Sequence, residues 1–168
     1  MWILTFVSVL AVAVFLVGYW LKKRELPESL SACVYAFDSR NAQMVWTGFV
    51  WVSGVCGMIP LTAKMCDLGV VGFVVMAFLA FVGIMPLTDK KARPWHYTLA
   101  LFAGVLSQVC VALVCAWWLL VWLVMAVLIG GCMCALNDAE KDVSICDGKG
   151  VLIAECLCAL SVWGVSLV

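Results

Sequence analysis

The stretch from residue 95 to residue 136 contains no aspartate, glutamate, lysine or arginine. An α-helix rises 1.5 Å per residue, so about 20 apolar residues cross the roughly 30 Å hydrocarbon core of a bilayer. This uncharged stretch is therefore long enough for two membrane spans and too long for one. Three apolar runs of similar length precede it and one follows it. The pattern predicts an all-α integral membrane protein.

The composition of the whole chain excludes most other classes of protein. Hydrophobic residues make up 67% of the 168 residues and charged residues only 12%, whereas soluble domains carry about 25% charged residues. The net charge is zero, and no basic patch indicates binding to nucleic acid. Because the apolar runs leave no room for a soluble domain, we expect one transmembrane domain over residues 1–168, with the lipid bilayer as its main partner.

We expect this domain to be a bundle of six transmembrane helices. Three tryptophans, Trp117, Trp118 and Trp122, fit an interfacial belt where the fourth and fifth helices join. The expected helices cover residues 2–21, 43–63, 68–87, 95–114, 115–136 and 150–168.

A short amphipathic helix is expected at about residues 27–37, between the first and second spans. Leu30, Cys33 and Phe37 recur at helical spacing, and Pro27 suits a first helical turn. Such a helix would lie on the membrane surface. The alternative is an ordinary cytoplasmic loop.

Basic residues predict the orientation. Nine of the ten lysines and arginines fall in the first, third and fifth loops, and only Lys64 falls elsewhere. The positive-inside rule then places these loops in the cytoplasm and both termini outside it. The first run has no basic residue before it and Lys22, Lys23 and Arg24 after it, which favours a retained helix. The alternative is a cleaved signal peptide.

One row of small and polar residues marks the fourth expected helix. His96, Ala100, Gly104 and Gln108 are spaced by four, so they stack on one face of a helix. In so apolar a chain, this face is expected to point towards other helices or a cavity. Gln108 would bond to Ser53 or Thr47 of the second helix, or belong to a polar pathway.

Glu155 and His96 are the candidate residues for a proton or ligand site. Glu155 lies about five residues inside the last helix, where an ionisable group costs on the order of 2–3 kcal/mol and usually has a partner. His96 is expected at nearly the same depth, and Gln108 deeper. A carboxylate beside an imidazole forms a natural proton-binding pair. Asp89, Asn137 and Asp138 are loop residues that could join this cytoplasmic-facing site.

Simpler interpretations exist for both residues. Glu155 could extend its carboxyl group to the cytoplasmic surface or be protonated. His96 could be a helix-end histidine bonded to backbone or to lipid headgroups.

The sequence gives no reason to expect a metal, a cofactor or a catalytic centre. The chain has a single histidine, which excludes a site built from several histidines. The acidic loop Asp138-x-Glu140-x-Asp142 fails the calcium-loop pattern, because Val143 stands where glycine is required and Lys149 where glutamate is required. We therefore favour a non-enzymatic function.

Several short motifs lie between residues 26 and 110: Pro27-Glu-Ser-Leu-Ser, a Gly-x-x-Pro end on the second and third helices, and His96-Tyr97 opening the fourth. In this layout the chain resembles small, uncharacterised multi-pass inner-membrane proteins of gut bacteria and their phages. The resemblance implies a bacterial inner-membrane location. It carries no activity, so it assigns no residue a role.

Three functions agree with these features. The first is a small transporter or permeation protein, acting alone or as a homo-oligomer, with a cytoplasmic-side proton or ligand site. The second is a non-catalytic interaction, immunity or partner subunit that binds another membrane protein. The third is a lipid-acting enzyme in which His96 works with Asp89 or Glu155 as acid and base.

Overall fold

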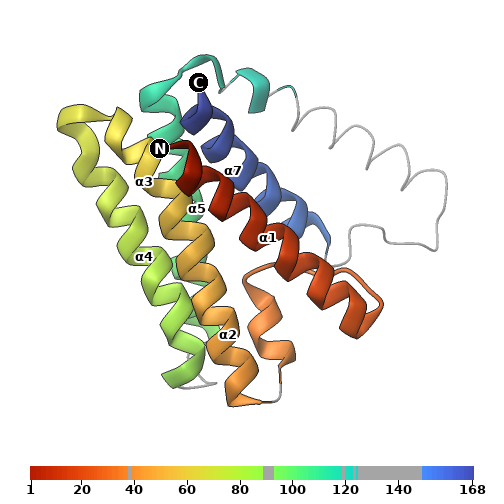
Figure 1. Ribbon diagram of the computed structural model, residues 1–168. Helices are drawn as coiled ribbons and strands as arrows, with labels where there is room; N and C mark the ends of the chain where they lie inside the picture. Colours follow the sequence, from red (N-terminus) through yellow and green to blue (C-terminus); the bar gives the residue numbers. More distant parts are fainter. Residues whose placement is uncertain (38, 89–92, 119, 123, 125–148) are drawn as a thin grey trace, which may run out of the picture.

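The computed structural model describes residues 1–37, 39–88, 93–118, 120–122, 124 and 149–168. Within these ranges every regular element is a helix (Figure 1), so the all-helical prediction is confirmed there. Four helical segments are long and apolar enough to cross a membrane: Trp2–Lys23, Arg40–Lys64, Cys66–Leu87 and Arg93–Val114. A shorter apolar helix covers Val151–Leu167. Most of the expected helix 115–136 lies outside the described residues.

The helices form a bundle in which the two chain termini lie at the same end (Figure 1). The last helix, α7 (Lys149–Leu167), packs against α1 (Trp2–Lys23), α3 (Cys56–Lys64) and α5 (Arg93–Val114). Helix α4 (Gly69–Thr88) packs against α2 (Arg40–Val50), α3 and α5. A hydrogen bond from Trp163 Nε1 to Ser8 Oγ, 2.8 Å long, joins α7 to α1 near the termini.

The second apolar segment, expected as one helix over 43–63, is one continuous helical stretch, Arg40–Lys64, with a π-helical turn inside it. Its parts are α2 (Arg40–Val50), the π-helical turn η2 (Trp51–Val55) and α3 (Cys56–Lys64), and a short 3-10 helix η3 (Cys66–Leu68) follows. Pro60 inside α3 has no backbone N–H to donate to the preceding turn. In the wider turn η2, the Ser53 carbonyl accepts a 2.5 Å hydrogen bond from Ser8 Oγ of α1.

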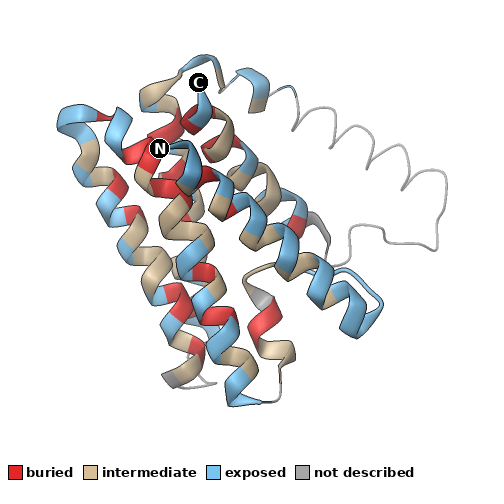
Figure 2. Ribbon diagram, in the orientation of Figure 1, coloured by how far each residue is buried: buried red, intermediate tan, exposed pale blue. Residues whose placement is uncertain are grey.

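The buried residues follow the inner faces of the helices and form two apolar clusters (Figure 2). One cluster packs α3, α4, α5 and α7 together and contains Leu61, Val75, Cys110 and Val162. The other contains Trp46 of α2 and Val82 of α4, packed on two residues that follow α1 in sequence, Cys33 and Val34.

The outer faces are strongly apolar, as expected of helices surrounded by lipid. On α1 the buried residues are the small polar Thr5 and Ser8, whereas Trp2 is 76% and Phe6 67% exposed. This is the reverse of a soluble helix, which buries its apolar face. Lipid tails or other apolar helices can cover the outer face without an energetic penalty.

The segment after α1 differs from the amphipathic surface helix expected over 27–37, and that helix is not confirmed. The structure has only a short 3-10 helix there, η1 (Ala32–Ala36). Cys33 and Val34 are buried against the bundle. The Glu28 carbonyl and both backbone groups of Leu30 and Ser31 are bonded to other helices, so they are not available for the bonds of a local helix. We call residues 28–31 the inner linker.

Candidate functional site

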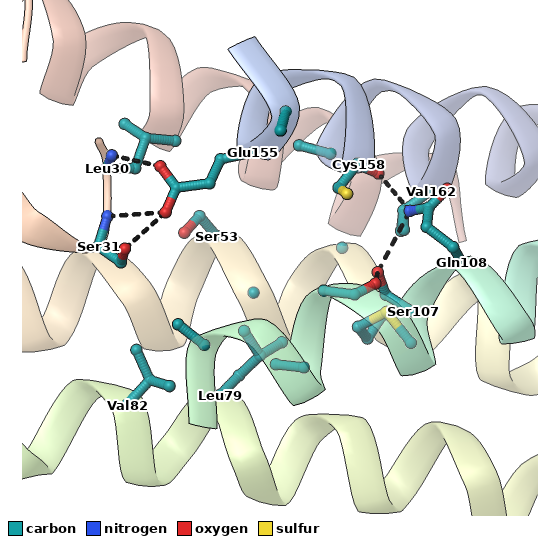
Figure 3. A pocket seen from close by; sticks show the side chains of 18 of the residues that line it. Leu30, Ser31, Ser53, Leu79, Val82, Ser107, Gln108, Glu155, Cys158 and Val162 are labelled. Atoms are coloured by element: carbon teal, nitrogen blue, oxygen red, sulfur yellow. Dashed lines mark hydrogen bonds between the residues drawn. The ribbon is translucent and has the colours of Figure 1, made fainter. Parts of the chain in front are cut away.

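The Glu155 carboxylate accepts four hydrogen bonds from the inner linker. Ser31 donates twice, through Oγ at 2.6 Å and through its backbone N–H at 3.2 Å. The Ser29 hydroxyl donates at 2.9 Å and the Leu30 N–H at 2.5 Å. Figure 3 shows the carboxylate turned away from its own helix towards Leu30 and Ser31. Hydrogen bonds to an ionised acceptor are about twice as strong as neutral ones, so the charged form of Glu155 suits this site best.

The carbonyl groups of the inner linker are bound by three different helices. The Leu30 carbonyl accepts from Trp46 Nε1 of α2 at 3.1 Å, and the Ser31 carbonyl lies 2.8 Å from His96 Nε2 of α5. The Glu28 carbonyl accepts a 3.1 Å bond from the Leu152 N–H. That amide is in the first turn of α7, where amides have no acceptor within their own helix. The linker therefore ties α2, α5 and α7 together.

His96 is completely buried between two backbone carbonyl oxygens. Its Nε2 faces the Ser31 carbonyl of the linker, and its Nδ1 lies 3.2 Å from the Val82 carbonyl of α4. A neutral imidazole carries one N–H and can donate to only one of these oxygens, whereas an imidazolium donates to both. Protonation of His96 would thus add a bond between the linker side and α4.

Ser31 connects the two residues that the sequence singled out. Its N–H and hydroxyl donate to Glu155, while its carbonyl is the partner of His96. Both residues therefore belong to one network, joined through the linker. The two partners of His96 are backbone carbonyls, which agrees with the simpler interpretation of a backbone-bonded histidine.

The other candidate residues lie elsewhere. Gln108 donates through Nε2 to the Ser107 hydroxyl and the Cys158 carbonyl, both at 3.3 Å. The prediction that Gln108 bonds to Ser53 or Thr47 is wrong, because both of its hydrogen bonds go to Ser107 and Cys158. Asp89, Asn137 and Asp138 lie outside the described residues.

Sequence reasoning missed the linker residues Ser29, Leu30 and Ser31, and also Trp46. The serines lie in the stretch that was expected to form a surface helix, and Trp46 lies in the expected span 43–63. One feature of the sequence could have predicted the contact between Glu155 and the serines. Glu155 lies inside an apolar run and requires donors, and a serine-rich turn at a span end is a suitable source of them.

Two neighbouring groups stay uncharged near neutral pH. Burial, and then the negative charge of Glu155, raises the pKa of the Cys33 thiol to about 12. Burial also raises the pKa of Tyr35 to about 12, although the Arg93 guanidinium, 5.3 Å from its ring, acts in the opposite direction.

A cavity of about 1210 Å³ extends from this network along the space between α5 and α7. Its lining is mainly apolar, and Figure 3 shows its polar groups at two separate places. Ser31 and Glu155 lie at one, and Ser107 and Gln108 at the other. The Gln108 Oε1 atom is buried and has no hydrogen-bond partner among the described residues.

Within the part of the chain that the structure describes, no three histidine, cysteine or acidic side chains gather as a metal site would require.

No protein-family model, no curated protein and no solved structure matches this chain. The roles of its residues therefore have to be argued from geometry and chemistry.

Proposed function

We propose that this chain is a small membrane transport or permeation protein whose cytoplasmic-side opening responds to protonation of Glu155 and His96. The observation that carries the proposal is that both groups hold the same four-residue linker. Leu30 and Ser31 of that linker also line the cavity. Movement of the linker would therefore change the shape of the cavity at that end.

Protonation of Glu155 would weaken its hold on the linker. An ionised carboxylate only accepts hydrogen bonds, and all four groups facing it can donate. A protonated carboxyl group brings its own donor into this set. The serine hydroxyls can rotate to accept from it, but the N–H groups of Leu30 and Ser31 cannot. The titratable groups that interact with Glu155 are His96, Cys33, Cys156 and Cys158, and the rings of Tyr35 and Tyr97 lie beside His96.

The membrane arrangement belongs to the same proposal. The helix expected at 115–136, together with α7, brings the four candidate spans to six. The apolar part of α7, Val151–Leu167, would rise about 25 Å, which is at the short end of the range for a span. Six spans place both termini outside the cytoplasm and the linker at its cytoplasmic side, in agreement with the distribution of lysine and arginine. A bacterial inner membrane is the proposed location.

Proton flux into liposomes loaded with pyranine, driven by a potassium–valinomycin potential, tests the proposal. We expect the protein to give a flux that changes with external pH, and we expect Glu155→Gln to remove that pH dependence. Glu25→Gln makes the same chemical change at an exposed position and serves as the matched control. Absence of flux, or the same pH dependence in Glu155→Gln as in the parent protein, would contradict the proposal.

A second function, that of a partner subunit for another membrane protein or for a second copy, is favoured by the surface of α1. This helix presents an apolar face along most of its length, including Trp2, Phe6, Leu10, Val14 and Val17. A membrane partner could cover it as well as lipid does. Stable co-purification of a second protein in mild detergent, lost when Phe6 and Leu10 are replaced by larger tryptophans, would support this function over transport.

A further inference from the structure

Glu155 is the one charged side chain among the described residues that line the cavity between α5 and α7. No lysine, arginine or histidine belongs to that described lining. The carboxylate lies at one end of the cavity, and the walls beyond it are mainly apolar (Figure 3). Apolar surroundings weaken a charge less than water does, so the negative potential of Glu155 extends into the cavity. The cavity therefore attracts cations and repels anions.

The inner linker already uses the hydrogen-bonding capacity of this carboxylate. Its Oε1 atom accepts three bonds from Ser29 and Ser31, and its Oε2 atom accepts one from the Leu30 N–H. A carboxylate has about four lone-pair positions, and these bonds use about that number. All four donors are neutral groups, so they orient the carboxylate without cancelling its charge. Glu155 can therefore attract a positive charge but has little capacity left to accept from an N–H group.

Aromatic side chains and the cavity's volume favour a bulky cation. Phe49, Trp122 and Trp163 line the cavity and are partly exposed. The faces of such rings attract cations, and aromatic residues are the usual partners of quaternary ammonium groups. At about 1210 Å³ the cavity is larger than the pockets of about 300–1,000 Å³ that hold most small ligands. A cation that carries several alkyl or aryl groups would therefore fit.

The described walls of the cavity reach the outer surface of the bundle. Leu101 and Val105 of α5 and Val151 of α7 line the cavity and are also exposed. In the described part of the chain, the way in between α5 and α7 is thus apolar. A ligand that enters by this route comes from the lipid, and this selects cations with apolar substituents.

We propose that this cavity binds a lipophilic organic cation whose charged centre carries no N–H group, such as a quaternary ammonium or phosphonium ion. Glu155 supplies the opposite charge, and the aromatic and aliphatic walls contact the substituents. The proposal names the substrate class of the transport function proposed above and in that respect rests on it. Binding is measured without transport, so a failure to bind these cations and a failure to carry protons are separate results.

Two ions of the same size and shape but opposite charge, tetraphenylphosphonium and tetraphenylborate, test the selectivity for charge. Equilibrium dialysis of the protein in detergent micelles, corrected with protein-free micelles, gives both affinities. We expect the phosphonium to bind at least about ten-fold more tightly than the borate, and Glu155→Gln to remove this difference. Glu25→Gln, at an exposed position, should preserve it. No binding of the phosphonium, equal affinities for the two ions, or an undiminished preference in Glu155→Gln would overturn the proposal.

A second variant tests the location of the site without changing a charge. Gly104 lines the cavity, and a Cβ atom added there would meet no other atom within 4 Å, so Gly104→Leu would occupy cavity space without a clash. Gly48→Leu is the matched control, because a Cβ atom there is equally free and Gly48 does not line the cavity. We expect Gly104→Leu to weaken phosphonium binding about five-fold or more and Gly48→Leu to leave it unchanged. Equal affinities in the two variants would show that the cation binds elsewhere.

The preference for a cation without an N–H group has its own comparison. Tetrapropylammonium and protonated tributylamine have the same charge and the same number of carbon atoms, but only the second carries an N–H group. Because this group would find little acceptor capacity at Glu155, we expect tetrapropylammonium to bind about ten-fold more tightly in the same dialysis at pH 7. Equal or tighter binding of protonated tributylamine would overturn this part of the proposal.

Discussion

The inner linker and the space between α5 and α7 differ in how their surfaces are built: the first consists of paired polar groups, and the second is mainly apolar. Around the linker, polar groups from three helices saturate one another, and Glu155 alone accepts four hydrogen bonds. Along the space between α5 and α7 the lining is mainly apolar. The buried Gln108 Oε1 atom there has no hydrogen-bond partner among the described residues. The first region fixes its conformation through specific hydrogen bonds. The second region can bind only through packing of apolar groups, which a lipid tail or another apolar helix can both provide.

The largest expected effect concerns the reactivity of Cys33, which the linker buries. With a pKa of about 12, this thiol has on the order of a thousand-fold less thiolate at pH 8 than an ordinary cysteine. We therefore expect N-ethylmaleimide to label it about a thousand times more slowly than exposed Cys66. Peptide mapping after timed labelling measures both rates in the same sample. Comparable rates would show that the linker does not hold Cys33 in a closed site.

Loss of the His96 side chain should destabilise the protein more than any other single change in the network. His96→Ala would leave a cavity and remove the ring N–H that donates to the Ser31 or the Val82 carbonyl, so we expect the free energy of unfolding to fall by about 3 kcal/mol. Denaturant titration in detergent micelles measures this change. Thr98→Ala, at an exposed position on the same helix, is the control. Equal losses in the two variants would mean that the buried bonds of His96 contribute nothing specific.

Glu155→Gln should have a somewhat smaller effect. The amide provides one acceptor oxygen in place of two, and its NH₂ group faces donors of the linker, so we expect a loss of about 2 kcal/mol. The same denaturant titration applies, with Glu25→Gln as the control of equal chemistry. A loss no larger than in the control would remove Glu155 from the group of residues that hold the linker.

The smallest effect is expected at Gln108, in the space between α5 and α7. Its two hydrogen bonds are long and its Oε1 atom has no partner among the described residues. Replacing it with the similarly shaped methionine removes weak bonds and an unsatisfied acceptor together, so we expect a change within about 1 kcal/mol. A loss as large as that of His96→Ala would show that Gln108 is a strong polar contact, and the contrast between the two regions would disappear.

Four of the expected spans are found as helices in the described residues, whereas the linker differs from the expected surface helix, and both outcomes have physical reasons. Uncharged runs of about 20 residues leave few alternatives to a helix in lipid, because every backbone group must be satisfied internally. The side chains of His96 and Glu155 were also expected to turn inwards. The linker was misjudged because Leu30 and Cys33 have helical spacing. Its conformation depends on partners more than a hundred residues away, such as Glu155, and no local pattern contains that information. The π-helical turn before Pro60 was missed because the apolar pattern continues through it.

The central claim is that the charge of Glu155 holds the inner linker in place. Hydrogen–deuterium exchange of the Leu30 and Ser31 amides at constant pH measures this directly, since both N–H groups donate to that carboxylate. We expect Glu155→Gln to speed their exchange by about 30-fold, corresponding to about 2 kcal/mol, while Glu25→Gln leaves it unchanged. Exchange at these two amides that is as slow in Glu155→Gln as in the parent protein would contradict the claim.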